Sequence, residues 1–171
     1  GDLASKMYVR VALPAIKGDR LTYNADPIAN TKVAWVKRLG HAMLKSVELE
    51  IGGSRIDKHY GVWLDIWYEL THSEDQVRGY KEMIGDVAEL TALAGRTSSS
   101  DTTEVVLPAK MLYVPLQFWF CRNTGLALPL IALQYHQVRL YIEFEEIAKL
   151  LMWSGSTAPS TSNFSFDDAG V

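Results

Sequence analysis

Histidines and carboxylates are the residues of this sequence that could bind a metal. A metal site inside a β-barrel needs two or three histidines and a carboxylate that converge, usually with two histidines close together on one strand. The histidines here are far apart, at His41, His59, His72 and His136. His59, which has Asp57 and Asp65 near it in the sequence, is the best candidate. Scattered histidines explain the pattern better, so we expect no metal and no cofactor.

No nucleophile has a catalytic motif around it. Cys121 lies in an apolar run, where a small buried side chain is the better interpretation. The sequence also lacks a G-x-S-x-G motif and a glycine-rich loop before a helix. Glu143, Glu145 and Glu146 gather at the end of a predicted strand, where a solvated edge is the simpler explanation. We therefore predict no catalytic residues and no enzymatic activity.

Tryptophans could form a stacking platform for sugars, as in a lectin. They stand at Trp35, Trp63, Trp67, Trp119 and Trp153. Residues 63, 66, 67 and 70 are apolar and share one stripe of a predicted helix, which we interpret as its buried face. Packing is then the more direct role for the tryptophans at 63 and 67. We keep a carbohydrate-binding or cupin-like jelly-roll module as a second hypothesis for the function, beside the one given by the resemblance described below.

Length and composition indicate one soluble domain with a real core. The chain has 171 residues, of which 48% are hydrophobic and 22% charged. A net charge of -3 gives no broad surface for phosphates, so we expect no direct binding to nucleic acid. One cysteine excludes an intrachain disulfide and fits a reducing compartment. We find no signal peptide and no run of the roughly 20 apolar residues that a spanning helix needs.

The densest apolar stretch, residues 110–146, organises the predicted fold. Alternate positions are apolar over 112–120, which predicts a strand that lies at an edge or is irregular at Pro115. A turn is expected over 122–125, and a second strand from Val138 to Phe144. Apolar residues stand at odd positions over 131–135 and at even positions after His136. We therefore predict a β-bulge or strand break near His136 that restores the register.

Other segments alternate in the same way. We predict a strand over 7–13 closed by Pro14, and a hairpin over 47–60 that turns at Gly52 and Gly53. Two short helices follow, one over 63–70 and one from Ser73 to Gly85, with loops over 17–30 and 95–103. Residues 147–153 finish as a strand or a helix. The chain is thus predicted to be all-β, an antiparallel β-sandwich with short helical insertions and a core that includes Val47, Leu49, Ile51, Leu116, Phe118, Leu140 and Ile142.

Four runs of the chain carry a family resemblance. They resemble the first half of the major capsid protein of the nucleocytoplasmic large DNA viruses, the group of iridoviruses, phycodnaviruses and giant amoebal viruses. The runs are GDLASKMYVRVALPA, AWVKRLGHAMLKSVELEIGGSRIDKHYGVWLDIWYELT, GYKEMIGDV and LYVPLQFWFCRNTGLALPLIALQYHQVRLYIEF. The resemblance implies a jelly-roll sandwich that is the first half of a double jelly roll.

The resemblance also implies a domain plan and a function. Residues 1–153 would form the N-terminal jelly roll without its opening strand, and residues 154–171 a tail or linker towards a second jelly roll. Either the sequence is a piece of a longer protein, which we favour, or a shortened paralogue exists. The implied protein is a homotrimer of pseudo-hexagonal outline that tiles the icosahedral shell of the virion, beside neighbouring capsomers and minor capsid proteins and above an internal membrane. Assembly would take place in the host cytoplasm. The insertion over 61–104 is long enough to be available for the outer surface or for a neighbour.

Overall fold

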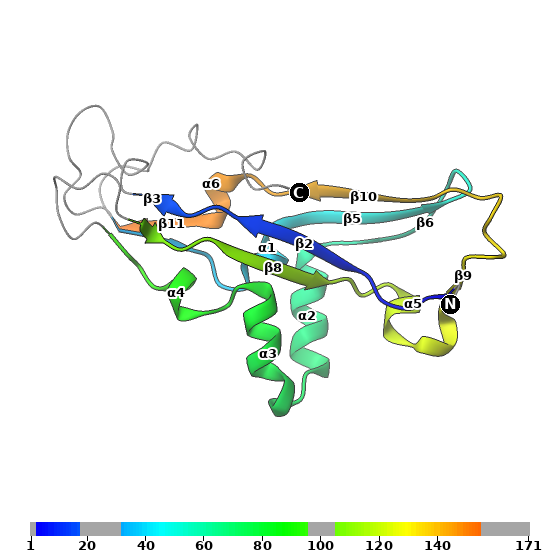
Figure 1. Cartoon of the computed structure of the whole chain (residues 1–171), viewed down its shortest axis with the longest axis horizontal. Helices are drawn as coiled ribbons and strands as arrows, with labels where there is room; N and C mark the ends of the chain where they lie inside the picture. The colour runs from blue at the N-terminus through cyan, green and yellow to red at the C-terminus, as the bar shows by residue number, and fades with distance from the viewer. Residues whose placement is uncertain (1–2, 18–31, 96–104, 155–171) are drawn as a thin grey trace.

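The computed structural model describes residues 3–17, 32–95 and 105–154. Strands are the commonest regular elements among these residues, with short helices between them (Figure 1). The strands are β1 Leu3–Ala4, β2 Tyr8–Leu13, β3 Ile16–Lys17, β4 Lys32–Trp35, β5 Leu44–Ile51, β6 Ser54–His59, β7 Val105–Leu107, β8 Lys110–Pro115, β9 Leu128–Pro129, β10 Val138–Phe144 and β11 Leu151–Ser154. The helices are α1 Leu39–Ala42, α2 Gly61–Thr71, α3 Glu74–Ile84, α4 Ala88–Thr91, α5 Trp119–Arg122, η2 Thr124–Leu126 and α6 Ile147–Leu150.

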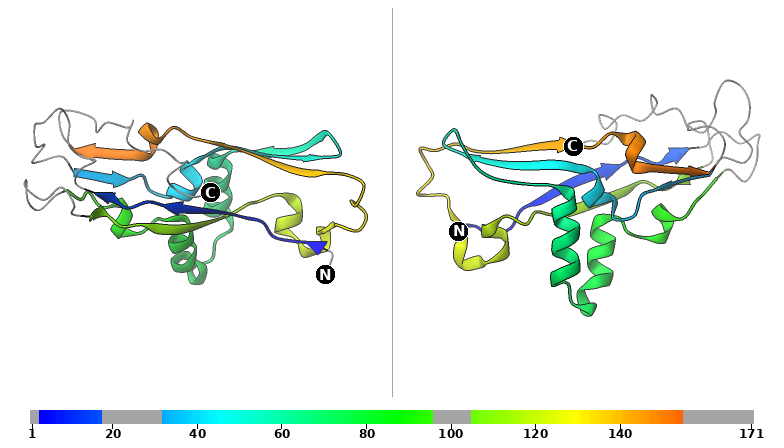
Figure 2. Two further views of the ribbon diagram at one scale, coloured as in Figure 1. Left: turned by 45° about the horizontal axis from the view of Figure 1, so that its top comes forward. Right: turned by 180° about the vertical axis from the view of Figure 1, so that it is seen from behind.

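Antiparallel pairs build two layers with the core between them. One layer is the sheet β10-β5-β6, and the other is carried by the pair β2-β8, while shorter pairs β3-β7, β4-β11 and β1-β9 extend the layers at their ends. Both views in Figure 2 show the β10-β5-β6 sheet lying over β2 and β8. Val11 and Leu112 face each other across β2 and β8 and are fully buried, as are Val47 and Leu49 of β5. The antiparallel β-sandwich with short helical insertions predicted from the sequence is therefore confirmed.

The hairpin predicted at the two glycines is confirmed. Gly52 and Gly53 have φ values of 60° and 83°, which suit a residue without a β-carbon, and they join β5 to β6. Residues of β10 alternate between half-buried and exposed, as predicted. Of the predicted core, Val47, Leu49, Leu116 and Phe118 are buried, and Ile51, Leu140 and Ile142 are half-buried and pack against them.

The strand predicted over 112–120 is wrong in its second half. β8 ends at Pro115, and Trp119–Arg122 forms the helical turn α5. Pro115 pairs with Tyr8, the first residue of β2. The backbone beyond residue 116 therefore has no residue of β2 beside it with which to continue the strand pairing. Phe118 and Phe120 remain fully buried, and their rings stack with centroids 5.7 Å apart. The alternating pattern thus identified core residues without identifying their backbone conformation.

The segment over 131–135 is a series of turns, so the apolar phase read there does not belong to a strand. Ile131 is 66% exposed and Tyr135 88% exposed, and the His136 amide donates a hydrogen bond to the carbonyl of Leu133. The register change predicted near His136 is therefore a strand break, and β10 begins at Val138. The bulge in this strand lies elsewhere, between Glu143 and Phe144.

Both predicted helices exist, but the buried face of α2 is not the predicted one. Leu64 and Tyr68 are buried, whereas Ile66 and Leu70 are 47% and 76% exposed. Trp63 and Trp67 are half-buried. α3 begins after Ser73 as predicted, without a hydrogen bond from the Ser73 side chain, and ends at Gly85 with φ of 78°. Residues 147–153 contain both a helix, α6, and a strand, β11. The predicted loops over 17–30 and 95–103 and the tail lie almost entirely outside the described residues.

Candidate functional site

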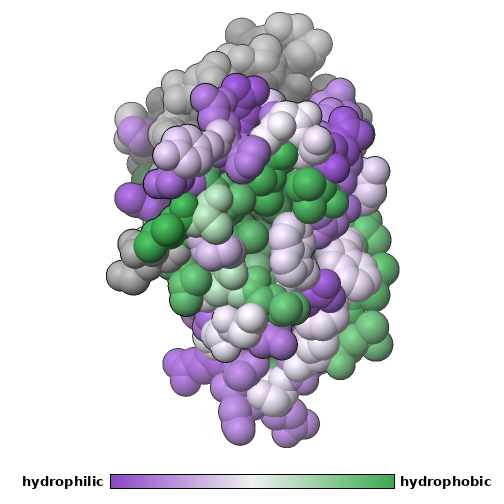
Figure 3. Space-filling model, turned by 90° about the vertical axis from the view of Figure 1, so that its right-hand side faces the viewer, coloured by the Kyte–Doolittle hydropathy of each residue, from purple (hydrophilic) through white to green (hydrophobic). Residues whose placement is uncertain are grey.

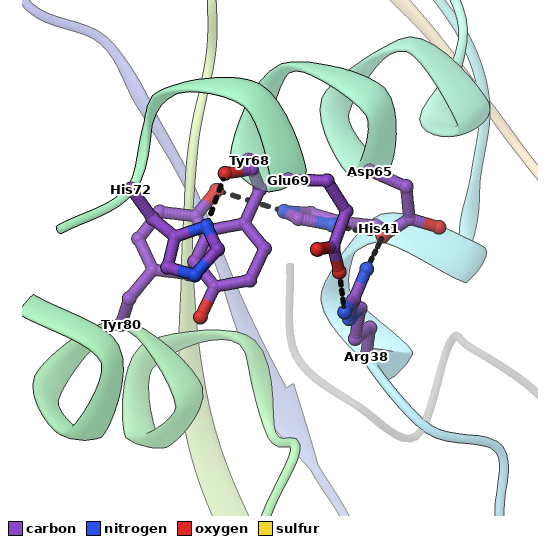
Figure 4. A network of polar contacts seen from close by, with 7 residues as sticks. All are labelled: Arg38, His41, Asp65, Tyr68, Glu69, His72 and Tyr80. Carbon is purple, nitrogen blue, oxygen red and sulfur yellow. Dashed lines mark hydrogen bonds and ion pairs between the residues drawn. The ribbon is translucent and has the colours of Figure 1, made fainter. Parts of the chain in front are cut away.

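A cluster of polar side chains joins α1, α2 and α3 where the helical hairpin α2-α3 meets the sandwich. Figure 1 shows these two helices side by side, projecting away from the sheets. Figure 4 shows the cluster, whose side chains come from α1 and the residue before it, from α2 with the residue that follows it, and from α3. Its members are Arg38, His41, Asp65, Tyr68, Glu69, His72 and Tyr80.

His41 is the centre of this cluster and is fully buried. Its Nδ1 lies 2.6 Å from Oδ1 of Asp65, and its Nε2 lies 2.8 Å from the hydroxyl of Tyr80. Because a carboxylate only accepts, Nδ1–H donates to Asp65, and in that tautomer Nε2 accepts from the Tyr80 hydroxyl. Burial raises the pKa of Tyr80 far above its ordinary value, so this hydroxyl keeps its proton. Each helix of the cluster is thereby bonded to the same imidazole.

Arg38 adds a second set of contacts at the surface of the cluster. Its backbone is left-handed, with φ of 53°, immediately before α1. Its guanidinium pairs with Glu69, lies 3.6 Å from Asp65, and sits 5.1 Å from the ring centroid of Tyr68. Tyr68 in turn stacks on Tyr80, with ring centroids 4.6 Å apart. α1, α2 and α3 are therefore held in one arrangement by charge pairs and by stacked rings.

The backbones of α1 and α2 also touch directly. At Gly61, the first residue of α2, an added β-carbon would stand 2.5 Å from the carbonyl oxygen of Leu44 and closer still to that of His41. Only glycine allows this approach, because such contacts with backbone atoms cannot be relieved by moving a side chain. The polar cluster and this close contact together fix the direction in which the hairpin projects.

This His41–Asp65 pair resembles the base of a catalytic dyad in composition, but its geometry serves structure. Nε2, the atom that would take a proton from a nucleophile, is occupied by Tyr80, and the ring has no exposed surface. The sequence reasoning missed this pair because the two residues are 24 positions apart. One signal was present: Asp65, Tyr68, Glu69 and His72 recur at helical spacing and mark one side of α2.

The structure separates the residues proposed for metal binding. Asp65 bonds His41 and not His59, which instead lies against Phe118 with ring centroids 4.4 Å apart. No group of three or more histidine, cysteine or acidic side chains converges on a metal-sized site within the described ranges. His72 packs on Tyr68 within the polar cluster.

The remaining candidates have structural surroundings. Burial raises the pKa of the Cys121 thiol, which makes it a weak nucleophile at neutral pH. Glu143 accepts a hydrogen bond of 2.5 Å from Lys45, which holds the pKa of that carboxyl below its ordinary value. Glu145 pairs likewise with Lys149 at 2.8 Å. These carboxylates are ion-paired at an exposed strand end.

Stability of the fold is expected to fall in mild acid because of His59. Burial, together with the charge of Arg122, lowers the pKa of its imidazole, although Asp57 opposes the shift. The unfolded chain therefore binds a proton at His59 more readily than the folded chain does. Stability is fully present above the unfolded pKa of about 6.5 and is lost as pH falls from there through the folded pKa. Denaturant unfolding between pH 7.5 and 5 should show this loss, and His59→Gln should flatten the slope; an unchanged slope in the variant would refute the assignment.

Apolar side chains are exposed on the outer side of α2 and at the neighbouring end of the molecule. Val62, Ile66 and Leu70 recur every four residues and are 47% to 76% exposed; we call them the α2 stripe. The end carrying β9 and α5 shows apolar side chains across its centre and along one margin, between polar zones above and below (Figure 3). Exposed residues of elements at this end include Leu3, Leu126, Leu130 and Ile131. Large exposed apolar patches typically mark contact surfaces.

Comparison with known proteins identifies the family. The family model described as major capsid protein N-terminus matches residues 1–171. Capsid protein 1 of Acanthamoeba polyphaga mimivirus is 43% identical over 173 residues, which cover 100% of this chain and 28% of that protein. The major capsid protein of Phaeocystis pouchetii virus is 42% identical, over 94% of this chain and 32% of that protein. The chain thus spans about a third of the length of these relatives.

Solved structures agree. The PBCV-1 VP54 crystal structure, fitted into a reconstruction of the virophage Sputnik, superposes with a TM-score of 0.60 at 34% identity, over 84% of this chain and 28% of that one. The faustovirus major capsid protein, at 16% identity and a TM-score of 0.52, shares the fold. The antiparallel sandwich, the family model over residues 1–171 and these relatives lead to one conclusion. The chain belongs to the major capsid protein family of large DNA viruses and corresponds to its N-terminal part.

Proposed function

We propose that this chain is the N-terminal jelly roll of a capsid subunit that trimerises into pseudo-hexagonal capsomers and tiles the icosahedral shell of a large double-stranded DNA virus. The observation that carries the proposal is the family match over residues 1–171. In this proposal residues 1–153 are the first jelly roll, and residues 154–171 lead towards a second one. As a member of a capsid protein family, the protein is a structural component of the virion.

The structure supports a building-block role in physical terms. A shell subunit must keep its shape while its loops make contacts, and the two layers here enclose a continuous core of buried aliphatic and aromatic side chains. The helical hairpin is fixed to this core by the His41 cluster, so its outer surface is presented in one orientation. Shell subunits associate through several modest interfaces, each of which needs an apolar centre and a polar rim.

The α2 stripe is our candidate for the contact with the next subunit of the trimer. Its three exposed residues recur every four positions on α2. Figure 1 shows this helix projecting from the sandwich. An apolar groove of about 580 Å³ runs beside it, lined in part by Leu44, Tyr60 and Trp63. In a closed three-fold ring each copy would offer this stripe to a different surface of its neighbour.

Placing a charge on the α2 stripe should weaken the trimer. In the full-length protein, Ile66→Glu with Leu70→Glu would bury two carboxylates against apolar surface, at about 2–3 kcal/mol each, so trimer formation should weaken by roughly a thousandfold or more. Native mass measurement across a dilution series reports the change. Leu93→Glu is the matched control, because Leu93 is 47% exposed and lies outside the stripe, after α4. Equal trimer stability in the double variant and the control would exclude this surface.

Further partners follow from the same proposal. Neighbouring capsomers and minor capsid proteins would contact other surfaces of the trimer, and an internal membrane would lie beneath the shell. Among the described residues no helix has the length and apolar character needed to cross a bilayer. The net charge of -3 favours contacts with protein over direct contact with nucleic acid. Assembly in the host cytoplasm fits a chain with a single cysteine.

A further inference from the structure

A cavity of about 300 Å³ lies between β6, the start of α2 and the α5 region. It is separate from the His41 cluster. Its walls combine cationic, anionic, amide and aromatic side chains: Asp57, Lys58, His59, Tyr60, Trp63, Gln117 and Arg122. A cavity of this size accommodates a single sugar ring or a side chain, and small-molecule sites usually have such mixed linings.

His59 in this wall contains a polar atom that the fold leaves unsatisfied. The residue is only 6% exposed, and its Nε2 is buried without a hydrogen-bond partner among the described residues. Native proteins pair nearly all buried polar atoms, and each exception needs a reason such as a bound ligand or water. The fold therefore leaves one polar atom of a cavity-lining residue without a partner.

Two more donors in the wall are free. Arg122 lies over the ring of Trp67, 5.0 Å from its centroid, and forms no ion pair within the part of the chain that the structure describes. The Gln117 amide likewise has no side-chain hydrogen bond with any described residue, and Asp57 has no cationic partner there. Lys58 is shared with Glu48, at 3.6 Å. The cavity thus offers an unpaired guanidinium, an amide and a carboxylate to a ligand.

Aromatic side chains provide the rest of the lining. Tyr60 is 54% exposed, and Trp63 is half-buried and lies 5.9 Å from Trp67, centroid to centroid. Trp63 was expected on a buried face, where it would only pack. Its actual position on the wall of a polar cavity gives it the surroundings of a sugar-stacking ring, which needs an apolar face beside hydrogen-bonding groups.

We propose that this cavity binds a pyranose that carries a carboxylate, as the terminal unit of an acidic glycan. Arg122 would pair with the sugar carboxylate, Gln117 and Asp57 would hydrogen-bond its hydroxyls, and Tyr60 and Trp63 would contact its apolar face. A bare acidic side chain fits less well, because it would leave the Asp57 carboxylate without a hydroxyl donor and the faces of Tyr60 and Trp63 without a contact. Tyr60 and Trp63 also line the groove beside the α2 stripe, so the sugar site adjoins the proposed trimer contact; the site is inferred from this cavity and not from the trimer.

Binding to the full-length protein tests this directly. Ligand-observed NMR with D-glucuronic acid, D-glucose and acetate separates the contributions of ring and charge. We expect saturable binding of glucuronic acid, at least tenfold tighter than that of glucose, and weaker binding still for acetate. Lack of saturable binding by glucuronic acid would overturn the proposal. Acetate binding as tight as that of glucuronic acid would replace it with a simple carboxylate site.

Variants locate the binding. Arg122→Gln and Gln117→Ala should each weaken glucuronic acid binding, the first by at least tenfold and the second by several-fold. Gln117→Ala removes a side chain without hydrogen bonds to described residues, so it tests the site even where Arg122→Gln disturbs Trp67. Arg78→Gln, an exposed arginine of α3 outside the cavity, is the matched control and should bind normally. Wild-type affinity in both cavity variants would show that the sugar binds elsewhere.

Discussion

Gly61→Ala is expected to destabilise the protein by on the order of 3 kcal/mol or more. The new methyl group would stand 2.5 Å from the carbonyl oxygen of Leu44 and closer to that of His41. Both are backbone atoms, so relief requires moving α2 away from α1, which would also separate Asp65 from His41. Insertion into a packed core already costs about 1–3 kcal/mol when side chains can adjust. Urea unfolding of the variant measures the loss.

Gly79→Ala is the matched control for Gly61→Ala. Gly79 lies inside α3, and a β-carbon there meets no atom within 4 Å. Alanine should therefore stabilise the helix by about 0.5–1 kcal/mol, since it restricts the unfolded chain and adds no clash. Opposite signs for the two glycines are the expected result. A mild effect at Gly61 would mean that α1 and α2 are not in backbone contact.

His41→Ala is the second large effect, expected to cost about 3 kcal/mol. The substitution removes a fully buried ring, leaves a cavity, and deprives Asp65 and the Tyr80 hydroxyl of their partner. Because α1, α2 and α3 meet at this ring, the hairpin should lose its fixed position before the sandwich unfolds. Hydrogen exchange of α2 and α3 amides should rise more than that of β2 and β8.

Tyr80→Phe separates the hydrogen bond from the packing. It keeps the ring that stacks on Tyr68 and removes only the hydroxyl that bonds His41. We expect a loss of about 1 kcal/mol, because an unpaired imidazole nitrogen remains buried. A cost equal to that of His41→Ala would locate the stabilising effect in Tyr80 itself, and no cost would show that the 2.8 Å contact is not a stabilising bond.

Period-two patterns predicted the regular strands well. β2, the β5-β6 hairpin and β10 follow from alternation and from two glycines at a turn, because each strand has one face on the core. The same rule was wrong for α5 because a buried position and a strand position look alike in sequence. β8 ends at Pro115 because its partner β2 begins at Tyr8, the residue paired with Pro115. Partner length is a tertiary property that local alternation does not contain.

The candidate sites were harder to predict, for a related reason. α2 is apolar on more than one side, so its hydropathy pattern predicted that Ile66 and Leu70 are buried. The helix in fact buries Leu64 and Tyr68. The choice is made by α1, whose backbone reaches Gly61 and whose His41 bonds Asp65. A buried histidine between helices cannot be recognised until their packing is known. The exposed α2 stripe and the cavity beside Trp63 both result from which face of α2 is turned toward the core.

Native mass spectrometry of the full-length protein at micromolar concentration is the most direct measurement. The proposed capsid subunit should be recorded as a trimer that persists on dilution. The trimer should dissociate more readily when the α2 stripe, its proposed contact surface, carries the two glutamates. A protein that stays a single copy at that concentration would contradict the proposed capsomer.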